Sequence, residues 1–179
     1  MGGFKLNTNG CSIGNPGRAW GGGVLCDGEG KLLLTFSTSF GSSTSIQAEA
    51  RALLFRVNFY ISREYVRVQV EVDTLVLVQI LKQAIRCLWS IDTEVWALLQ
   101  LSSHFICICH CFREGNQVAY CLSNIGCDEG GDRTYHQFSN LPTKARGAFR
   151  LDRIGLPSLR NARATICLGV VPLLSIHVT

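Results

Sequence analysis

The chain lacks a long apolar segment. Hydrophobic residues make up 47% of its 179 residues, yet no run reaches the roughly 18 apolar residues that a membrane span needs. The nearest candidate, residues 165–178, is short and contains Gly169 and Pro172. The N-terminus has no apolar core of a signal peptide, and no Asn-x-Ser/Thr acceptor for N-glycosylation occurs. We therefore expect a protein of the cytoplasm or the nucleus.

Cysteine is plentiful, but its spacing is not that of a disulfide scaffold. The nine cysteines are odd in number and irregularly spaced, and without a secretory signal this predicts reduced thiols. Cys107, Cys109 and Cys111 alternate along an apolar stretch, so on a strand they would share one face. A zinc site there would need a fourth ligand, and His110 would point to the opposite face. We expect three buried, metal-free cysteines, with zinc binding as the alternative.

Charged residues are also scarce, at 17% of the chain, and their signs are unevenly distributed. Between residues 144 and 163, six basic residues stand against one acid, Asp152, whereas the remaining chain has eleven basic and twelve acidic residues. The six are Lys144, Arg146, Arg150, Arg153, Arg160 and Arg163. A basic segment on a nearly neutral domain could bind phosphates. A solvated extension explains the same charges equally well, so both interpretations stay open.

Hydrophobic periodicity predicts alternating strands and helices. The expected strands are residues 4–8, 19–26, 31–40, 66–72 and 105–111, and the expected helices are residues 46–60, 74–86, 91–103 and 117–124. Gly14-Asn15-Pro16-Gly17 predicts a tight turn, and residues 42–45 offer N-cap side chains. This order predicts an α/β fold with a mixed five-stranded sheet and packed helices. Because the periodicity weakens after Gly126, we expect one domain over residues 4–126 and a partly irregular, poorly ordered C-terminal extension over residues 127–179.

A series of short motifs follows this pattern along the chain. The motifs are Lys5-Leu6-Asn7-Thr8, the turn at residues 14–17, Gly22-Gly23-Val24, Gln47-Ala48-Glu49-Ala50, Val70-Glu71-Val72-Asp73 and Arg113-Glu114-Gly115-Asn116-Gln117-Val118-Ala119. In this order they resemble the plant ribonuclease H-like domains, of type 1, that occur in retrotransposon polyproteins and in free-standing relatives. The resemblance spans about residues 4–160. It implies an RNase H-like fold and an endonuclease family that uses Mg²⁺ to hydrolyse RNA in RNA–DNA hybrids.

The resemblance further implies an active site of four carboxylates. Mg²⁺ prefers anionic oxygen ligands, and two such ions together promote phosphodiester cleavage. The corresponding positions here are Asn9, Glu49, Asp73 and Tyr120. Glu49 and Asp73 match the family, whereas an amide replaces the carboxylate that bridges both metals and a phenol replaces the fourth. We therefore expect impaired catalysis, with Asn9, Glu49 and Asp73 as weak metal ligands at most.

Substrate contacts in this family come from the turn after the first strand and from helix starts. By position, Ser12, Asn15, Ser45 and Asn116 are candidates for contacts with the 2′-hydroxyls or phosphates of a hybrid. Each of them is also an ordinary turn or cap residue. The family's flexible histidine loop does not fit into residues 113–116, which are too few to hold it.

Three functions stay open at this point. The chain is a degenerate RNase H-like domain with little or no catalysis, a working hybrid-cleaving nuclease, or a non-catalytic module that binds nucleic acid or a protein. The loss of two charged ligands favours the first and third over the second. The basic, tryptophan-bearing handle of some relatives is absent, and we expect Trp89 and Trp96 to pack in the core or between helices.

Overall fold

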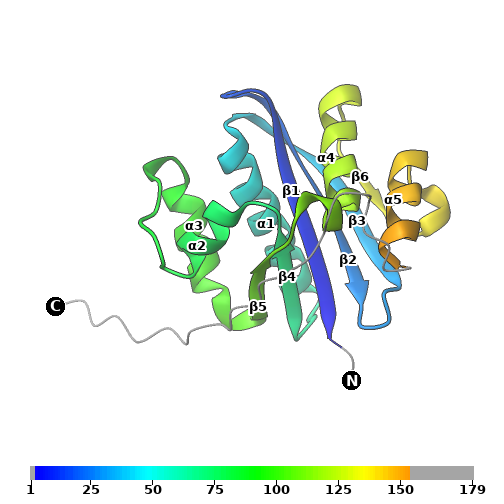
Figure 1. The fold of residues 1–179 in the computed structure, drawn as a ribbon, viewed down its shortest axis with the longest axis horizontal. Coiled ribbons are helices and arrows are strands. Elements are labelled where there is room, and N and C mark those ends of the chain that lie inside the picture. Colours follow the sequence, from blue (N-terminus) through cyan, green and yellow to red (C-terminus); the bar gives the residue numbers. More distant parts are fainter. Residues whose placement is uncertain (1–2, 154–179) are drawn as a thin grey trace.

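The structure is a computed structural model that describes residues 3–153. Its six strands are β1 (Phe4–Gly14), β2 (Gly17–Asp27), β3 (Leu32–Ser43), β4 (Val68–Val72), β5 (Phe105–His110) and β6 (Arg133–Tyr135). They form one sheet in the order β5-β4-β1-β2-β3-β6. β1, β2 and β3 are antiparallel neighbours, whereas β4 pairs in parallel with both β1 and β5 (Figure 1). The predicted α/β fold with a mixed sheet is confirmed.

The helices alternate with the strands after β3. They are α1 (Ser45–Ser62), α2 (Leu75–Leu81), α3 (Asp92–Gln100), α4 (Gln117–Glu129) and α5 (Thr143–Arg153), with short 3₁₀ turns η1 (Trp89–Ile91), η2 (Ser102–His104), η3 (Arg113–Gly115) and η4 (Phe138–Asn140). α1 begins with a capping box, in which Thr44 Oγ1 accepts from the Gln47 backbone and Gln47 Oε1 accepts from the Thr44 backbone. The N-cap is thus one of the predicted candidates. None of the described helices is long and apolar enough to cross a bilayer.

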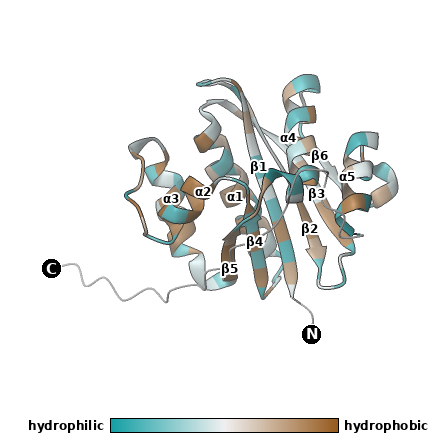
Figure 2. Cartoon of the chain, viewed as in Figure 1, coloured by the Kyte–Doolittle hydropathy of each residue, from teal (hydrophilic) through white to brown (hydrophobic). Residues whose placement is uncertain are grey.

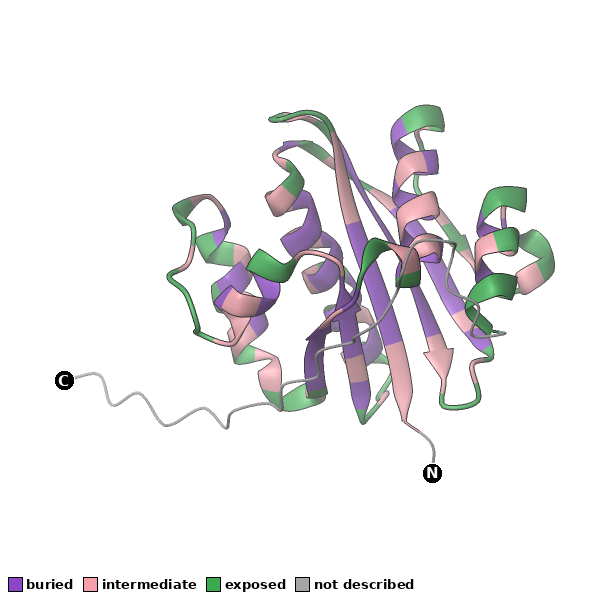
Figure 3. Ribbon diagram, in the orientation of Figure 1, coloured by how far each residue is buried: buried purple, intermediate pink, exposed green. Residues whose placement is uncertain are grey.

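The helices cover both faces of the sheet, because neighbouring residues of a strand point to opposite sides. A Cβ atom added to Gly21 of β2 would meet Ala52 of α1, whereas one added to Gly22 would collide with the backbone of α4. Two apolar cores result, one between the sheet and α1–α3 and a smaller one beneath α4 and α5. Figure 2 shows the apolar residues along the strands, and Figure 3 shows that the middle parts of the strands are buried whereas several strand ends are exposed or partly exposed.

The region after residue 126 differs from the prediction. β6 pairs antiparallel with β3, with Thr35 opposite Tyr135, so the sheet has six strands instead of five. Residues 143–153 form α5, which buries Ala145 and Phe149 against α4. A three-residue strand is too short to show a periodicity, and in α5 only these few apolar residues carry the helical pattern. Residues 154–179, the rest of the predicted extension, lie outside the described residues.

The segment from α2 to α3 also differs from the prediction. α2 ends at Leu81, before the predicted limit near residue 86, and Gln83 then adopts a left-handed backbone with φ of 58°. We expected Trp89 and Trp96 to pack in the core or between helices. Trp89 is 92% exposed and Trp96 is 66% exposed, so neither lies in the core. Periodicity identifies an apolar side chain but cannot tell whether the fold places a neighbour against it.

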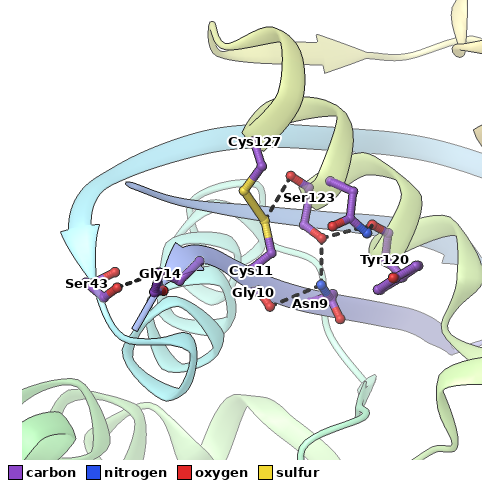
Figure 4. Close-up of a disulfide and its surroundings, with 10 residues drawn as sticks. Asn9, Gly10, Cys11, Gly14, Ser43, Tyr120, Ser123 and Cys127 are labelled. Carbon is purple, nitrogen blue, oxygen red and sulfur yellow. Dashed lines mark hydrogen bonds between the residues drawn. A yellow bond between two sulfur atoms is a disulfide. The ribbon is translucent and has the colours of Figure 1, made fainter. Parts of the chain in front are cut away.

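The cysteines follow the prediction in part. Cys107, Cys109 and Cys111 are buried, as predicted, and the sulfur atoms of Cys107 and Cys109 lie 3.5 Å apart. The expectation of reduced thiols is wrong for Cys11 and Cys127, which form a disulfide between β1 and α4 (Figure 4). Because 116 positions separate these two cysteines, their sequence spacing did not indicate that the fold brings them together.

Candidate active site

Four elements bring the predicted site positions together. Asn9 lies on β1, Glu49 in the first turns of α1, Asp73 directly after β4 and Tyr120 in the first turn of α4. The parallel pairing of β1 with β4 places Asp73 beside the strand that carries Asn9. Gly10 allows α1 to start against β1, since a Cβ atom there would collide with the backbone of residues 48 and 49.

These elements surround a cavity of about 360 Å³. Its lining residues are Asn9, Gly10, Cys11, Ser12, Ser45, Ile46, Glu49, Thr74, Arg113 and Tyr120. The lining therefore combines three of the four predicted site positions with two of the predicted substrate-contact residues. A cation, Arg113, lies among them.

The amide of Asn9 is part of the packing between β1 and α4. Asn9 Nδ2 donates to Ser123 Oγ at 2.6 Å and to the Gly10 carbonyl at 3.2 Å (Figure 4). Ser123 Oγ in turn donates to the Tyr120 carbonyl at 3.0 Å. A carboxylate at position 9 has no N–H group and could not donate in this way. The amide of Asn9 thus serves as a structural hydrogen-bond donor between β1 and α4.

The two remaining carboxyl groups lie in an environment that disfavours their charge. Burial and the nearby Asp73 raise the pKa of Glu49 well above its usual range, while the Gly10 amide, Thr74 and Arg113 oppose this shift. Burial also raises the pKa of Asp73, and Arg113 is the main opposing influence. Glu49 Oε2 and Asp73 Oδ1 are buried and accept no hydrogen bond from the described residues. A bound cation or a proton shared between the two groups would satisfy these oxygens.

Arg113 is the site residue that the sequence did not single out. Its Nε atom lies 3.4 Å from Asp73 Oδ2, and its Cζ atom lies 5.0 Å from the centre of the Tyr120 ring. η3 places it there, at the connection between β5 and α4. The available signal was its position three residues before Asn116, in a motif that otherwise contributes residues to this site.

The donor groups do not match a two-ion centre. Among residues 3–153, no group of three or more His, Cys, Asp or Glu side chains gathers as a metal site. Glu49 and Asp73 supply two carboxylates, and the guanidinium of Arg113 already contacts one of them. Mg²⁺ is usually held by one or two carboxylates together with waters and substrate phosphates, so Glu49 and Asp73 fit one ion better than two.

The predicted substrate-contact residues fall into two groups. Ser12 and Ser45 line the cavity, and Ser12 Oγ donates to the Ser43 carbonyl at 2.7 Å. Asn15 and Asn116 instead stabilise the fold: Asn15 Oδ1 accepts from the Ser45 backbone at 3.0 Å, and Asn116 Nδ2 donates to the Thr8 carbonyl at 2.8 Å. Since Asn116 is only 1% exposed, the structure does not support a contact between its side chain and a hybrid.

Known proteins share this chain's motifs and fold. Residues 7–126 match the model of the reverse transcriptase-like family. An Arabidopsis thaliana protein named as a ribonuclease H protein is 32% identical over 170 residues, which are 91% of this chain and 26% of that protein. The chain therefore spans about a quarter of the length of this curated relative.

Solved structures share the fold. RNase H1 from the halophilic archaeon Halobacterium salinarum superposes with a TM-score of 0.67 at 25% identity, covering 70% of this chain and 98% of that one. The N-terminal RNase H domain of a Mycobacterium tuberculosis protein gives 0.67 at 22% identity, over 73% and 96% of the two chains. LC11-RNase H1, isolated from compost and solved with an RNA/DNA hybrid, gives 0.65 at 24% identity, over 70% and 97%. With the family match over more than half of its length, the chain belongs to the reverse transcriptase-like family and has the RNase H fold.

Proposed function

We propose that this chain is a nucleic-acid-binding RNase H-like domain that binds RNA–DNA hybrids but cleaves them poorly or not at all. The observation that carries the proposal is the chemistry at the four site positions. Asn9 donates a hydrogen bond to Ser123, and the Tyr120 ring lies beneath Arg113, so neither offers the anionic oxygen that a carboxylate would.

Counting ionised side chains supports the proposed loss of activity. Four carboxylates carry a charge of about −4, whereas Glu49 and Asp73 alone carry about −2. The positive charge of Arg113 brings the net charge of the site to about −1. Burial also disfavours the ionised forms of Glu49 and Asp73. Two divalent ions would therefore find too little negative charge to hold them close together.

Hybrid binding is proposed on separate grounds. LC11-RNase H1, which shares the fold, has been solved in complex with an RNA/DNA hybrid. In this chain, Ser12 and Ser45 face the cavity, and their hydroxyl groups suit contacts with sugars and phosphates. The described part of the basic segment adds Lys144, Arg150 and Arg153 as exposed charges.

The test measures binding and cleavage separately. A labelled RNA–DNA hybrid, duplex DNA and duplex RNA are titrated with the protein in chelator and in Mg²⁺, and the products are resolved on a denaturing gel. We expect saturable hybrid binding in both buffers. We expect turnover lower by about 10⁴-fold or more than that of an active RNase H1 measured in parallel, since groups that act as one unit are rarely dispensable.

Each remaining hypothesis corresponds to a different outcome. Mg²⁺-dependent turnover that disappears in Glu49→Gln identifies the chain as a working endonuclease and refutes the proposed impairment. Turnover that persists in Glu49→Gln belongs to a contaminating nuclease and is excluded from the comparison. Failure to bind any of the three duplexes refutes nucleic-acid binding and favours a protein interaction module.

A further inference from the structure

Arg113 brings a positive charge to a site that the family fills with metal. The guanidinium extends from η3 to Asp73, with 3.4 Å between Nε and Oδ2. The Asp73 side chain is 3% exposed and that of Arg113 is 64% exposed, so the ion pair closes the solvent side of a buried carboxyl group. A partly buried pair of this kind is screened less than a pair on the open surface.

Tyr120 is placed to hold this cation. The Arg113 Cζ atom lies 5.0 Å from the centre of the Tyr120 ring, within the distance at which a guanidinium is attracted to an aromatic face. The residue that replaces the fourth family carboxylate therefore serves as a surface for Arg113. An Asp at this position would offer a second carboxylate in place of the ring.

The two carboxyl groups need a positive charge in any case. Glu49 Oε2 and Asp73 Oδ1 are buried without a hydrogen-bond partner among the described residues, and the guanidinium of Arg113 contacts Asp73 and lines the same cavity as Glu49. A divalent ion would satisfy the same need. The arginine and the metal are thus alternatives for the same pair of carboxyl groups.

We propose that Arg113 is a built-in cation that takes the electrostatic place of the divalent ions at this site, held between Asp73 and the ring of Tyr120. The inference rests on the proposed function, because it explains how the site stays folded without the two-ion centre. It implies that Mg²⁺ and Mn²⁺ compete with Arg113 for Asp73 and bind weakly to the natural chain.

The experiment compares metal binding in four proteins. The natural chain, Arg113→Gln, Arg113→Lys and the control Arg146→Gln are melted in chelator and in saturating Mg²⁺, and Mn²⁺ affinity is measured by electron paramagnetic resonance. Arg146 lies on α5 and contacts the Ser139 carbonyl and the Thr143 hydroxyl, so its replacement removes one charge away from the site.

We expect Arg113→Gln to melt below the natural chain in chelator and to recover in Mg²⁺, with Mn²⁺ binding about tenfold tighter, as the loss of one competing charge implies. Arg113→Lys and Arg146→Gln should show the weak metal response of the natural chain. The inference is wrong if Arg113→Gln does not respond to metal, or if the natural chain binds Mn²⁺ as tightly as Arg113→Gln does. Hybrid cleavage by the natural chain would instead refute the proposed function, so the two failures are distinct.

Discussion

At position 9, an amide nitrogen stands where the family resemblance implies a carboxylate oxygen. The side chains of asparagine and aspartate have nearly the same size, so we expect either residue to fit between β1 and α4. The amide nitrogen, however, donates to Ser123 Oγ at 2.6 Å. Such a bond stabilises a fold by about 1 kcal/mol. Asn9 therefore stabilises the packing of α4 on β1, but its amide lacks the negative charge that favours metal binding.

Glu49 gives a pH dependence of stability that can be measured in chelator. Because its pKa is raised in the fold above the ordinary 4.5, the folded protein holds this proton more tightly than the unfolded chain does. Its contribution to stability is therefore full at low pH and is lost as pH rises from about 4.5 toward the raised value.

Glu49→Gln should remove the loss of stability that Glu49 causes as pH rises. We expect the variant to melt above the natural chain near neutral pH and to match it at about pH 4. In a chain of this size, each 1 kcal/mol of unfolding free energy shifts the melting temperature by about 2–4 °C. Glu29→Gln is the control, since Glu29 is an exposed carboxylate in the turn between β2 and β3. Equal melting curves for Glu49→Gln and the natural chain at all pH values would show that Glu49 is ionised without cost.

At the scale of elements, the site depends on how closely α4 approaches the sheet. Gly22 of β2 lies against the backbone of residues 119–123, and this same part of α4 carries Tyr120 and Ser123. The first turns of the helix contact the strand directly because no side chain separates them. The Asn9–Ser123 hydrogen bond requires this close approach.

Gly22→Ala should therefore destabilise the fold by about 1–3 kcal/mol, since an added methyl group would overpack a tight contact. Urea denaturation measures this change. The matched variant is Gly147→Ala in α5, where nothing lies within 4 Å of an added Cβ atom. That change should stabilise the protein by about 0.5–1 kcal/mol through helix propensity. Equal effects of the two substitutions would contradict the close packing of α4 on β2.

Over the whole molecule, the basic residues of α5 and the candidate site lie on different elements. The cavity lies between β1, α1 and α4, whereas α5 packs on the outer side of α4 and carries Lys144, Arg146 and Arg150. Arg150 is held over the ring of Phe138, with 5.2 Å from Cζ to the ring centre. A nucleic acid long enough to extend beyond the cavity could contact both regions.

The salt dependence of hybrid affinity distinguishes an α5 that contacts phosphates from an α5 that is merely solvated. If α5 contacts phosphates, the triple variant Lys144→Gln, Arg146→Gln and Arg150→Gln should bind the hybrid more weakly. The slope of log affinity against log salt should fall by about 0.9 for each lost contact. Arg63→Gln, an exposed charge at the end of α1, should leave the slope unchanged. A triple variant with the slope of the natural chain would identify α5 as a solvated face.

The local sequence carried most of the fold. Residues 5–8, the turn at residues 14–17 and residues 47–50 form the strand, turn and helix start that their patterns predict, because the dihedral preferences and spacing that decide them act over a few neighbouring residues. The assignment of Asn9, Glu49, Asp73 and Tyr120 to the site positions came from the same local motifs, and it stays a prediction. The domain boundary near residue 126 stays a prediction.

Only the tertiary structure brought distant partners together. Arg113 and Asp73 are 40 positions apart, and Asn9 and Ser123 are 114 positions apart. The disulfide between Cys11 and Cys127 and the pairing of β6 with β3 are equally remote in sequence. Periodicity indicates which face of an element is apolar, but it contains no information about which element packs there. The chemistry of this site was therefore decided by the docking of η3 and α4 against β1 and β4.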